Sequence, residues 1–217
     1  YSKVAVKNIY NFNKESKLIV MIRNPIEIAR SFHQVALKVF GETETNFQKA
    51  WFLEKYRETG DQIPKSCIDR QLILYGNIAK IGQQIERLLF QIPLKNIHFI
   101  MYDDFKSATK HEYIKVLKFL KVSNEVPMNF SLYNKSQRIK NETVTKLTNY
   151  ASLFKKKLKI KTRFNVANKI HKVNITDQPL DKLPKNFLLE MDKYFEYDIN
   201  LLSQLIKKDL SKWRVSQ

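Results

Sequence analysis

Cysteine is almost missing from this sequence. Cys67 is the single cysteine among 217 residues, so the chain can form no internal disulfide. This usage is typical of a reducing compartment and favours a cytoplasmic location. Long apolar runs are missing as well, because the longest, LIVMI and the broken stretch around RLLF, are far too short to cross a bilayer. The sequence therefore predicts neither a signal peptide nor a transmembrane segment.

Acidic residues are in the minority, with 21 against 39 basic residues, and the net charge is +18. Such a charge attracts phosphates, polyanions and acidic membranes, although lysines spread over solvated faces would give the same total. Glycine is scarce, with 4 residues, and arginines are not interleaved with aromatic residues as they are in proteins that bind single-stranded nucleic acid. A specific nucleic-acid partner is therefore not expected. The oligomeric state is not indicated.

Hydrophobic residues make up 43% of the chain, and its length suffices for one domain with a sizeable core. Short apolar runs predict buried strands at 17–22 and 96–102. Apolar residues at helical spacing predict helices at 25–40, 46–58, 70–90 and 109–121, and a helical last third that breaks near Asp198. The order strand, helices, strand, helix predicts a single α/β domain over residues 1–217 with a parallel sheet.

The junction after the first strand, RNPIEIARS, carries the clearest chemistry in the sequence. Asn24 is a good N-cap, Pro25 suits the first helical position, and Glu27 at the third completes a pattern like a capping box. The helix start, with its free N–H groups, would lie at the carboxyl edge of the sheet, where α/β proteins bind anions. Arg23 could bind a phosphate there through two N–H groups. The hydroxyl of Ser31 could point to the same place.

Spacing alone favours a purely structural interpretation, in which Arg23 pairs with a nearby carboxylate and Ser31 lies at the border of the buried face. A resemblance to a known family changes this interpretation. A strand, R-[ND]-P and a helix with a serine eight residues after the arginine resemble the 3′-phosphate-binding element of sulfotransferases. HFIMYDDF and DKYFEYDINLLSQLIKKDLSKW resemble two further segments of that family. All three occur in the order and spacing found in bacterial and heparan-sulfate-type members.

The resemblance implies a three-layer fold of the P-loop nucleotide-hydrolase type, with a parallel sheet between helices and a helix-rich last third. It also implies a co-substrate, 3′-phosphoadenosine 5′-phosphosulfate (PAPS), which donates a sulfuryl group and leaves 3′-phosphoadenosine 5′-phosphate (PAP). The acceptor would be a hydroxyl or amine of a small molecule or carbohydrate, and no metal is implied. Arg23 and Ser31 match the family's 3′-phosphate ligands. The protein would act by positioning and by stabilising charge on the transferred group.

Two family features have no counterpart in the sequence. The Pro-Lys-x-Gly-Thr-Thr-like loop that holds the 5′-phosphosulfate is missing, and no glycine precedes Gly41 that could form a variant of it. We expect this loop and the general base to belong to residues upstream of Tyr1, so no catalytic residue is assigned and the chain alone should not turn over PAPS. The second 3′-phosphate loop is also missing, and its nearest candidate is the basic run at 155–163. The family's glycine after the helix at 109–121 is Lys121 here.

Two other functions stay open on the sequence alone. Asp103 and Asp104 follow the second strand and could hold Mg²⁺ in a kinase-like nucleotide-binding domain, although helix capping is their simpler role. The charge is also compatible with a non-catalytic module that binds acidic polysaccharide or nucleic acid. His33 is interpreted as a neighbour of Ser31 rather than as a base. Three further residues are expected to be packing residues: Trp51, His98 and Trp213.

Overall fold

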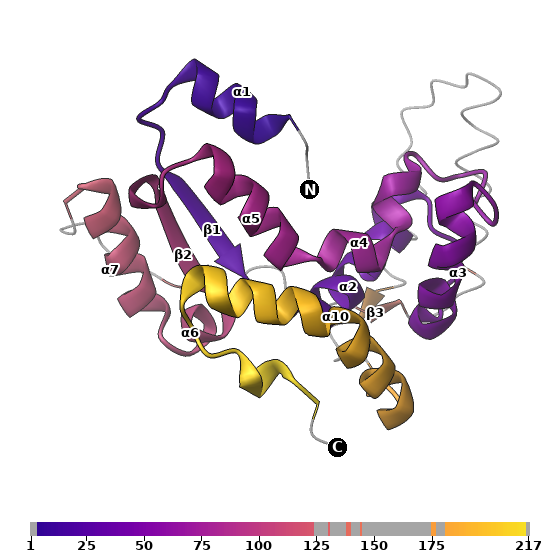
Figure 1. The fold of residues 1–217 in the computed structure, drawn as a ribbon. Helices are drawn as coiled ribbons and strands as arrows, with labels where there is room; N and C mark the ends of the chain where they lie inside the picture. The colour runs from indigo at the N-terminus through magenta and orange to yellow at the C-terminus, as the bar shows by residue number, and fades with distance from the viewer. Residues whose placement is uncertain are drawn as a thin grey trace. The chain divides into compact units, whose positions relative to one another are not determined.

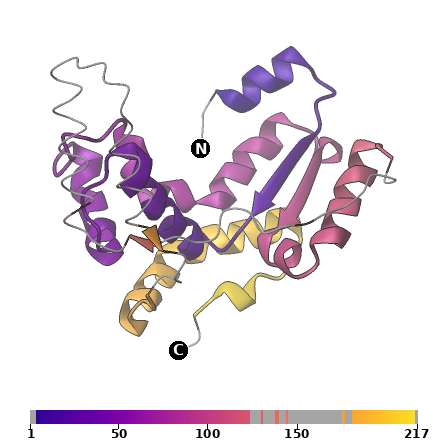
Figure 2. The same cartoon turned by 180° about the vertical axis from the view of Figure 1, so that it is seen from behind.

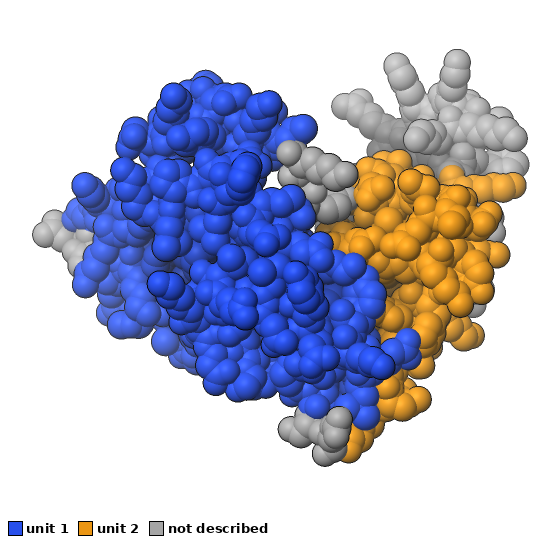
Figure 3. Space-filling model, viewed as in Figure 1, with its two compact units in different colours: residues 1–27, 80–132, 188–217 blue, residues 28–79, 133–187 orange. Residues whose placement is uncertain are grey.

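The structure is a computed structural model of the 217-residue chain, and it describes residues 4–123, 130, 138–139, 144, 175–176 and 181–215. In this part the chain is a helix-rich α/β protein (Figure 1). Its contacts divide it into two compact units (Figure 3). Unit 1 comprises residues 1–27, 80–132 and 188–217, and unit 2 comprises residues 28–79 and 133–187. Each unit is described by itself below.

The centre of unit 1 is a parallel pair of strands, β1 (Leu18–Ile22) and β2 (Ile97–Met101). Their register pairs Ile22 with Met101, the last residue of each strand, so both strands end at the same edge. The two predicted strands and the parallel sheet are thereby confirmed. Within the described ranges this sheet has two strands. The larger central sheet of a three-layer P-loop fold, which the resemblance implies, is therefore not observed there.

Helices pack around this sheet in unit 1. α7 (Thr109–Leu120) lies beside β2 in both ribbon views (Figures 1 and 2). The other helical elements of the unit are α1 (Ala5–Phe12), α5 (Ile81–Gln91), η3 (Leu94–Asn96), α6 (Tyr102–Ser107), most of α10 (Lys185–Ile206) and η4 (Ser211–Trp213). Buried apolar side chains come from strands and helices far apart in the chain: Ile22, Ile85, Leu88, Ile100, Met101, Met191, Phe195 and Leu202. One hydrophobic core therefore joins these segments.

The prediction of one continuous helix over 70–90 is wrong. The structure has three shorter elements there, η2 (Arg70–Ile73), α4 (Tyr75–Ala79) and α5. The backbone leaves helical geometry at Leu74 and at Lys80, whose ψ angles are 80° and 75°. Apolar spacing continues across both interruptions, which is why the sequence pattern alone did not reveal them.

The break predicted near Asp198 is also wrong, because α10 runs without interruption through this residue. Asp198 is buried and accepts hydrogen bonds from Gly82 N at 2.8 Å and Gln83 N at 3.0 Å. It thus caps the start of α5, which is a different helix from its own. A Cβ atom on Gly82 would lie 2.3 Å from the Asp198 carbonyl oxygen, so the close approach of the two helices requires glycine.

Helix α7 ends at a position that favours glycine. Lys121 has φ 61° and ψ 40°, in the left-handed region, and its N–H donates to Leu117 O. A side chain costs about 1 kcal/mol in this conformation. Lys121 therefore ends α7 in a conformation that glycine adopts at lower cost.

Unit 2 contains most of α2 (Pro25–Val35), the π-helical turn η1 (Ala36–Phe40), α3 (Phe47–Thr59), η2, α4 and a short antiparallel pair, β3 (Arg138–Ile139) and β4 (Ile175–Thr176). The predicted helix at 46–58 is confirmed. Asn46 caps it by accepting from Lys49 N at 3.0 Å, and Gly60 ends it with φ 103°. Four aromatic side chains pack edge to face in the core of this unit: Phe47, Trp51, Tyr75 and Phe187.

A buried ion pair crosses unit 2. Arg57 donates to both carboxylate oxygens of Glu42, at 2.6 and 2.9 Å, and both side chains are almost fully buried. The hydroxyl of Tyr75 donates to Glu42 Oε2 at 2.6 Å. Burial would raise the pKa of Glu42, but the bonds and charge of Arg57 outweigh it and hold that pKa below its usual value. The charged pair therefore fixes the loop after η1 against α3 and α4.

His33 is fully buried beside this pair, with Nε2 2.7 Å from Glu44 O and its ring edge-on to Tyr75. Burial is the largest influence on its pKa and lowers it. The Glu44 carbonyl and the Glu42 carboxylate raise this pKa, and Arg57 lowers it, without reversing the effect of burial. Burial thus favours the neutral form of His33, which packs in the core of unit 2; that it is a neighbour of Ser31 rather than a base stays a prediction.

We expect the protein to lose stability on acidification through His33. Below a pH of about 6.5 the unfolded chain binds a proton at this residue that the folded chain does not, so the free energy of unfolding falls as the pH falls. One proton corresponds to at most about 1.4 kcal/mol per pH unit. The free energy of unfolding, measured with urea between pH 5 and 8, should depend less steeply on pH in His33→Gln than in the wild type. His111→Gln, at an exposed position, is the control and should keep the full slope.

Candidate functional site

Arg23 lies at the carboxyl edge of the sheet, directly after β1. Its side chain is 29% exposed, and its guanidinium carbon lies 4.5 Å from the ring centroid of Tyr102, the residue directly after β2. Nε donates to Glu27 Oε2 at 2.7 Å. Nη1 and Nη2 have no hydrogen-bond partner among the described residues. A cation–π contact therefore covers one face of the guanidinium, while two of its nitrogens keep donors for a ligand.

The helix after Arg23 begins as the sequence predicted, with one difference. Asn24 Oδ1 accepts from Ile26 N at 2.9 Å and so caps α2, as expected of an N-cap. Glu27, expected to complete a capping box, instead pairs with Arg23 one turn earlier. The ion pair is the stronger interaction available to this carboxylate, because the guanidinium is charged and the backbone N–H is not.

Asp103 and Asp104 do not cap a helix through their side chains, which corrects the simpler role predicted for them. Asp103 Oδ2 accepts from the indole Nε1 of Trp213 at 3.2 Å, and Asp104 Oδ2 accepts from Lys208 Nζ at 2.5 Å. This lysine lowers the pKa of Asp104. Both carboxylates are thus engaged by donors from the C-terminal segment, which leaves them poorly placed to share a Mg²⁺ ion. Groups of three or more acidic, histidine or cysteine side chains suited to a metal do not occur within the described ranges.

Ser31 lies in the second turn of α2, and its side chain is exposed. Its hydroxyl forms no hydrogen bond with the described residues. Arg23 belongs to unit 1 and Ser31 to unit 2, and each is placed within its own unit. That the two side chains bind one phosphate therefore stays a prediction. The basic run at 155–163, considered for a second phosphate contact, lies outside the described residues.

The remaining expectations concern packing residues. Trp51 and Trp213 are buried, with exposed fractions of 7% and 5%. His98 lies in β2 and stacks on Phe119 with ring centroids 5.3 Å apart, while its Nε2 is buried without a partner in the part of the chain described. The expected packing role is therefore confirmed for the two tryptophans. The stacking of His98 on Phe119 agrees with the same role for His98.

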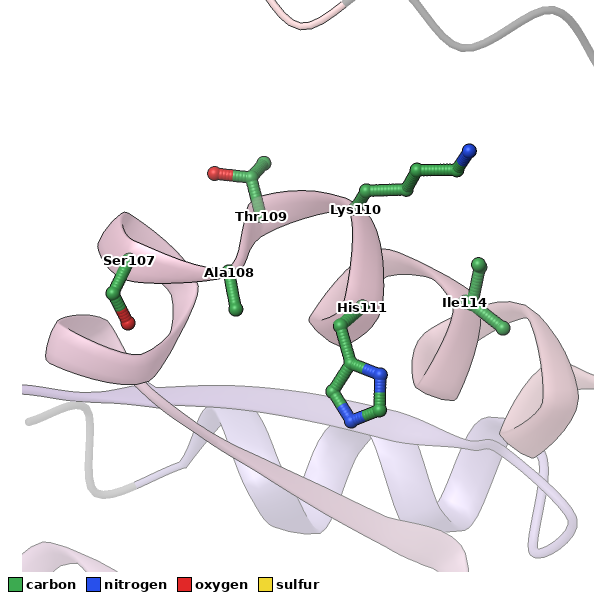
Figure 4. A pocket seen from close by; sticks show the side chains of 6 residues that line it. All are labelled: Ser107, Ala108, Thr109, Lys110, His111 and Ile114. Carbon is green, nitrogen blue, oxygen red and sulfur yellow. The ribbon is translucent and has the colours of Figure 1, made fainter.

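An open hollow of roughly 480 Å³ lies where α6 meets α7 in unit 1 (Figure 4). Figure 4 shows Thr109 and Lys110 projecting from one side of the ribbon and His111 from the other. The residues around the hollow are Ser107, Ala108, Thr109, Lys110, His111 and Ile114. Arg23 does not line it, so the hollow is not the predicted phosphate site.

Sequence reasoning missed two residues that contact the Arg23 region. Tyr102 follows β2 as Arg23 follows β1, but their contact depends on the register of the two strands, which no local pattern shows. Trp213 lies in a distant segment and gave no signal either. Its indole N–H donates to Asp103 and its carbonyl accepts from Asn24 Nδ2 at 3.3 Å, across 189 residues of sequence.

Comparison with known proteins gives one family and one fold. A family model described as "Sulfotransferase domain" matches residues 5–203. The fold is similar to the crystal structure of a sulfotransferase from Alicyclobacillus acidocaldarius, with a TM-score of 0.64 and 18% sequence identity. That match covers 97% of this chain and 62% of the other, so the chain spans less than two thirds of the length of this neighbour. No curated protein matches the chain.

Within the described residues, no helix has both the length and the apolar character needed to span a membrane.

Proposed function

This chain belongs to the sulfotransferase domain family, and we propose that it binds PAPS and takes part in the transfer of its sulfuryl group to a hydroxyl or amine of a small-molecule or carbohydrate acceptor. PAP is then the product that leaves the nucleotide site. The observation that carries the proposal is the position of Arg23, at the end of a parallel strand, on an aromatic ring and two residues before a helix that Asn24 caps. Arg23 and Ser31 would bind the 3′-phosphate.

The chemistry of Arg23 fits a phosphate. Its Nη1 and Nη2 are the two donors that a guanidinium uses for bidentate binding of phosphate oxygens. The ring of Tyr102 contacts one face of the guanidinium by a cation–π interaction and leaves the edge that carries Nη1 and Nη2 to a ligand. Ser31 adds an exposed hydroxyl without a hydrogen-bond partner among the described residues, which is suited to donate to a phosphate oxygen.

Glu27 opposes an anion at Arg23, because its carboxylate already binds Nε. The magnitudes decide which interaction prevails. A half-exposed ion pair at this spacing contributes about 0.3–0.5 kcal/mol, whereas a charge-assisted bond from a guanidinium to phosphate contributes about 1.5–3 kcal/mol. A nucleotide phosphate therefore outweighs Glu27 and either displaces it or binds at the free edge of the guanidinium.

Glu27→Gln should increase the affinity for PAP by about two- to fivefold, because the substitution removes a competing carboxylate and its repulsion of the phosphate. Isothermal titration at low salt measures the change. Glu86→Gln, at an exposed position on α5, is the matched control and should leave the affinity unchanged. A weaker binding of PAP by Glu27→Gln would mean that the carboxylate helps to orient Arg23 for the nucleotide.

The proposal is tested by comparing PAP with adenosine 5′-phosphate in the presence of EDTA. PAP should bind roughly tenfold more tightly or better, because only PAP carries the 3′-phosphate that Arg23 contacts. Equal affinities for the two nucleotides would contradict the assignment of the site. Binding of ATP that requires Mg²⁺ would instead favour the kinase-like alternative. Polyanion binding that depends steeply on salt and does not respond to PAP would favour a basic binding module.

The catalytic part of the reaction is not assigned to residues of this chain. The sequence contains no counterpart of the loop that holds the 5′-phosphosulfate, so we propose that these 217 residues bind the nucleotide without transferring the sulfuryl group. We also propose that β1 and β2 belong to a larger parallel sheet of the P-loop type. Sulfotransfer to an acceptor by the isolated chain would contradict the first of these proposals.

A further inference from the structure

The last nine residues of the described chain, 207–215, bind the carboxyl edge of the sheet in unit 1. We call them the C-terminal strap. The strap is anchored by Arg214, which donates to both carboxylate oxygens of Asp192 at 2.9 and 3.0 Å and to Glu196 at 3.0 Å. Two residues of the strap, Leu210 and Trp213, have buried side chains. The strap is therefore a fixed part of unit 1 with two buried anchors.

Trp213 connects the strap to both strand ends. Its backbone carbonyl accepts from Nδ2 of Asn24, the residue after Arg23, at 3.3 Å. Its indole Nε1 donates to Oδ2 of Asp103, the residue after Tyr102, at 3.2 Å. Trp213 thus ties together, through its backbone carbonyl and its indole, the residues that directly follow the cation and its aromatic partner.

This arrangement bears on the direction of the Arg23 guanidinium. Arg23 and Tyr102 come from different strands, and their contact of 4.5 Å depends on how closely the two strand ends are held. Asp103 is the second residue of α6, a helix without a side-chain N-cap, and the bond from Trp213 holds the start of this helix against the strap. Lys208 adds a second tie through Asp104.

We propose that Trp213 is a positioning residue for the anion site at Arg23. By holding Asn24 and Asp103, it keeps the ring of Tyr102 under the guanidinium and leaves Nη1 and Nη2 directed to the ligand. The inference rests on the proposed function for the identity of the ligand, PAP. The arrangement of Arg23 on Tyr102, however, is a property of the ligand-free protein and can be measured without any nucleotide.

The test uses four variants of the whole chain. Trp213→Phe keeps the packing and the backbone carbonyl but removes the indole N–H, and Asp103→Ala removes its acceptor. Asp103→Asn retains an oxygen acceptor and should restore the wild-type behaviour. Arg214→Gln weakens the anchor of the strap without touching either strand end, so it is the control for a merely structural effect.

Two measurements decide the outcome. The first is the ¹⁵Nε–¹H NMR signal of Arg23 in the ligand-free protein, identified by its loss in Arg23→Ala. It should move in Trp213→Phe and Asp103→Ala and keep its position in Asp103→Asn and Arg214→Gln. The second is PAP affinity, which should fall by about three- to tenfold in the first two variants, as for the loss of one hydrogen bond. It should stay within twofold in the other two.

An unchanged Arg23 signal in Trp213→Phe, or an equal shift in Arg214→Gln, would overturn the positioning role. A wild-type chain that shifts none of its signals with PAP would instead refute the proposed nucleotide, while the ligand-free signal would still decide the role of Trp213. A loss of thermal stability that is similar in Trp213→Phe and Arg214→Gln is compatible with the proposal only if their Arg23 signals differ.

Discussion

Replacing Arg23 with alanine should lower the affinity for PAP by roughly ten- to a hundredfold. The substitution removes the charge-assisted bonds to the 3′-phosphate, which contribute about 1.5–3 kcal/mol. Arg23→Lys should recover only part of the loss, because an ammonium cannot form the planar pair of bonds or stack on Tyr102 in the same way. Isothermal titration with PAP and EDTA measures the three affinities.

The control for Arg23→Ala is Arg87→Ala, which removes an exposed arginine from α5 in the same unit and the same charge from the protein. It should leave PAP affinity unchanged at physiological salt. Ser31→Ala should weaken binding by about two- to tenfold, since a neutral hydrogen bond contributes about 0.5–1.5 kcal/mol. Equal loss in Arg23→Ala and Arg87→Ala would show that PAP responds to net charge rather than to this site.

Replacing Arg57 with methionine should destabilise unit 2 by about 3–5 kcal/mol, because it leaves the buried carboxylate of Glu42 without its cation. Methionine keeps much of the volume, so the effect reports charge rather than a cavity. Urea unfolding measures it through Trp51 fluorescence in a Trp213→Phe background, where Trp51 is the single tryptophan and lies in unit 2.

Two further variants test whether this effect comes from the unpaired charge of Glu42. Arg70→Met changes an exposed arginine in the same unit and should cost far less. Glu42→Gln added to Arg57→Met should restore part of the stability, because an amide has no charge to leave unpaired while its oxygen can still accept from Tyr75. A single Arg57→Met variant as stable as wild type would mean that the pair contributes little despite its burial.

Local signals in the sequence were sufficient for the elements that form the site. The apolar run before Arg23 predicted β1, and Asn24 with Pro25 predicted the start of α2, because strand burial and helix capping depend on residues within a few positions of one another. The end of α3 follows in the same way from Gly60, whereas Lys121 at the end of α7 gives no such local signal. Family membership was also recognisable, since the motif and its order are local patterns.

Tertiary contacts decided the rest. Apolar periodicity continues across Leu74 and Lys80, so only the capping of α5 by Asp198, more than a hundred residues away, identifies where that helix begins. The partners of the acidic pair after β2 are likewise set by chain folding, because Trp213 and Lys208 approach them from the other end of the sequence.

The sequence by itself thus determined which residue presents a cation at the end of a strand and which helix begins beside it. Only the tertiary structure decided what holds that cation, because Tyr102 reaches Arg23 through the parallel register of two strands and Trp213 reaches both strand ends from the C-terminus. Such contacts join residues with no fixed spacing in sequence. Their energies appear only after the loop-closure entropy between the segments has been overcome, so no local pattern encodes them.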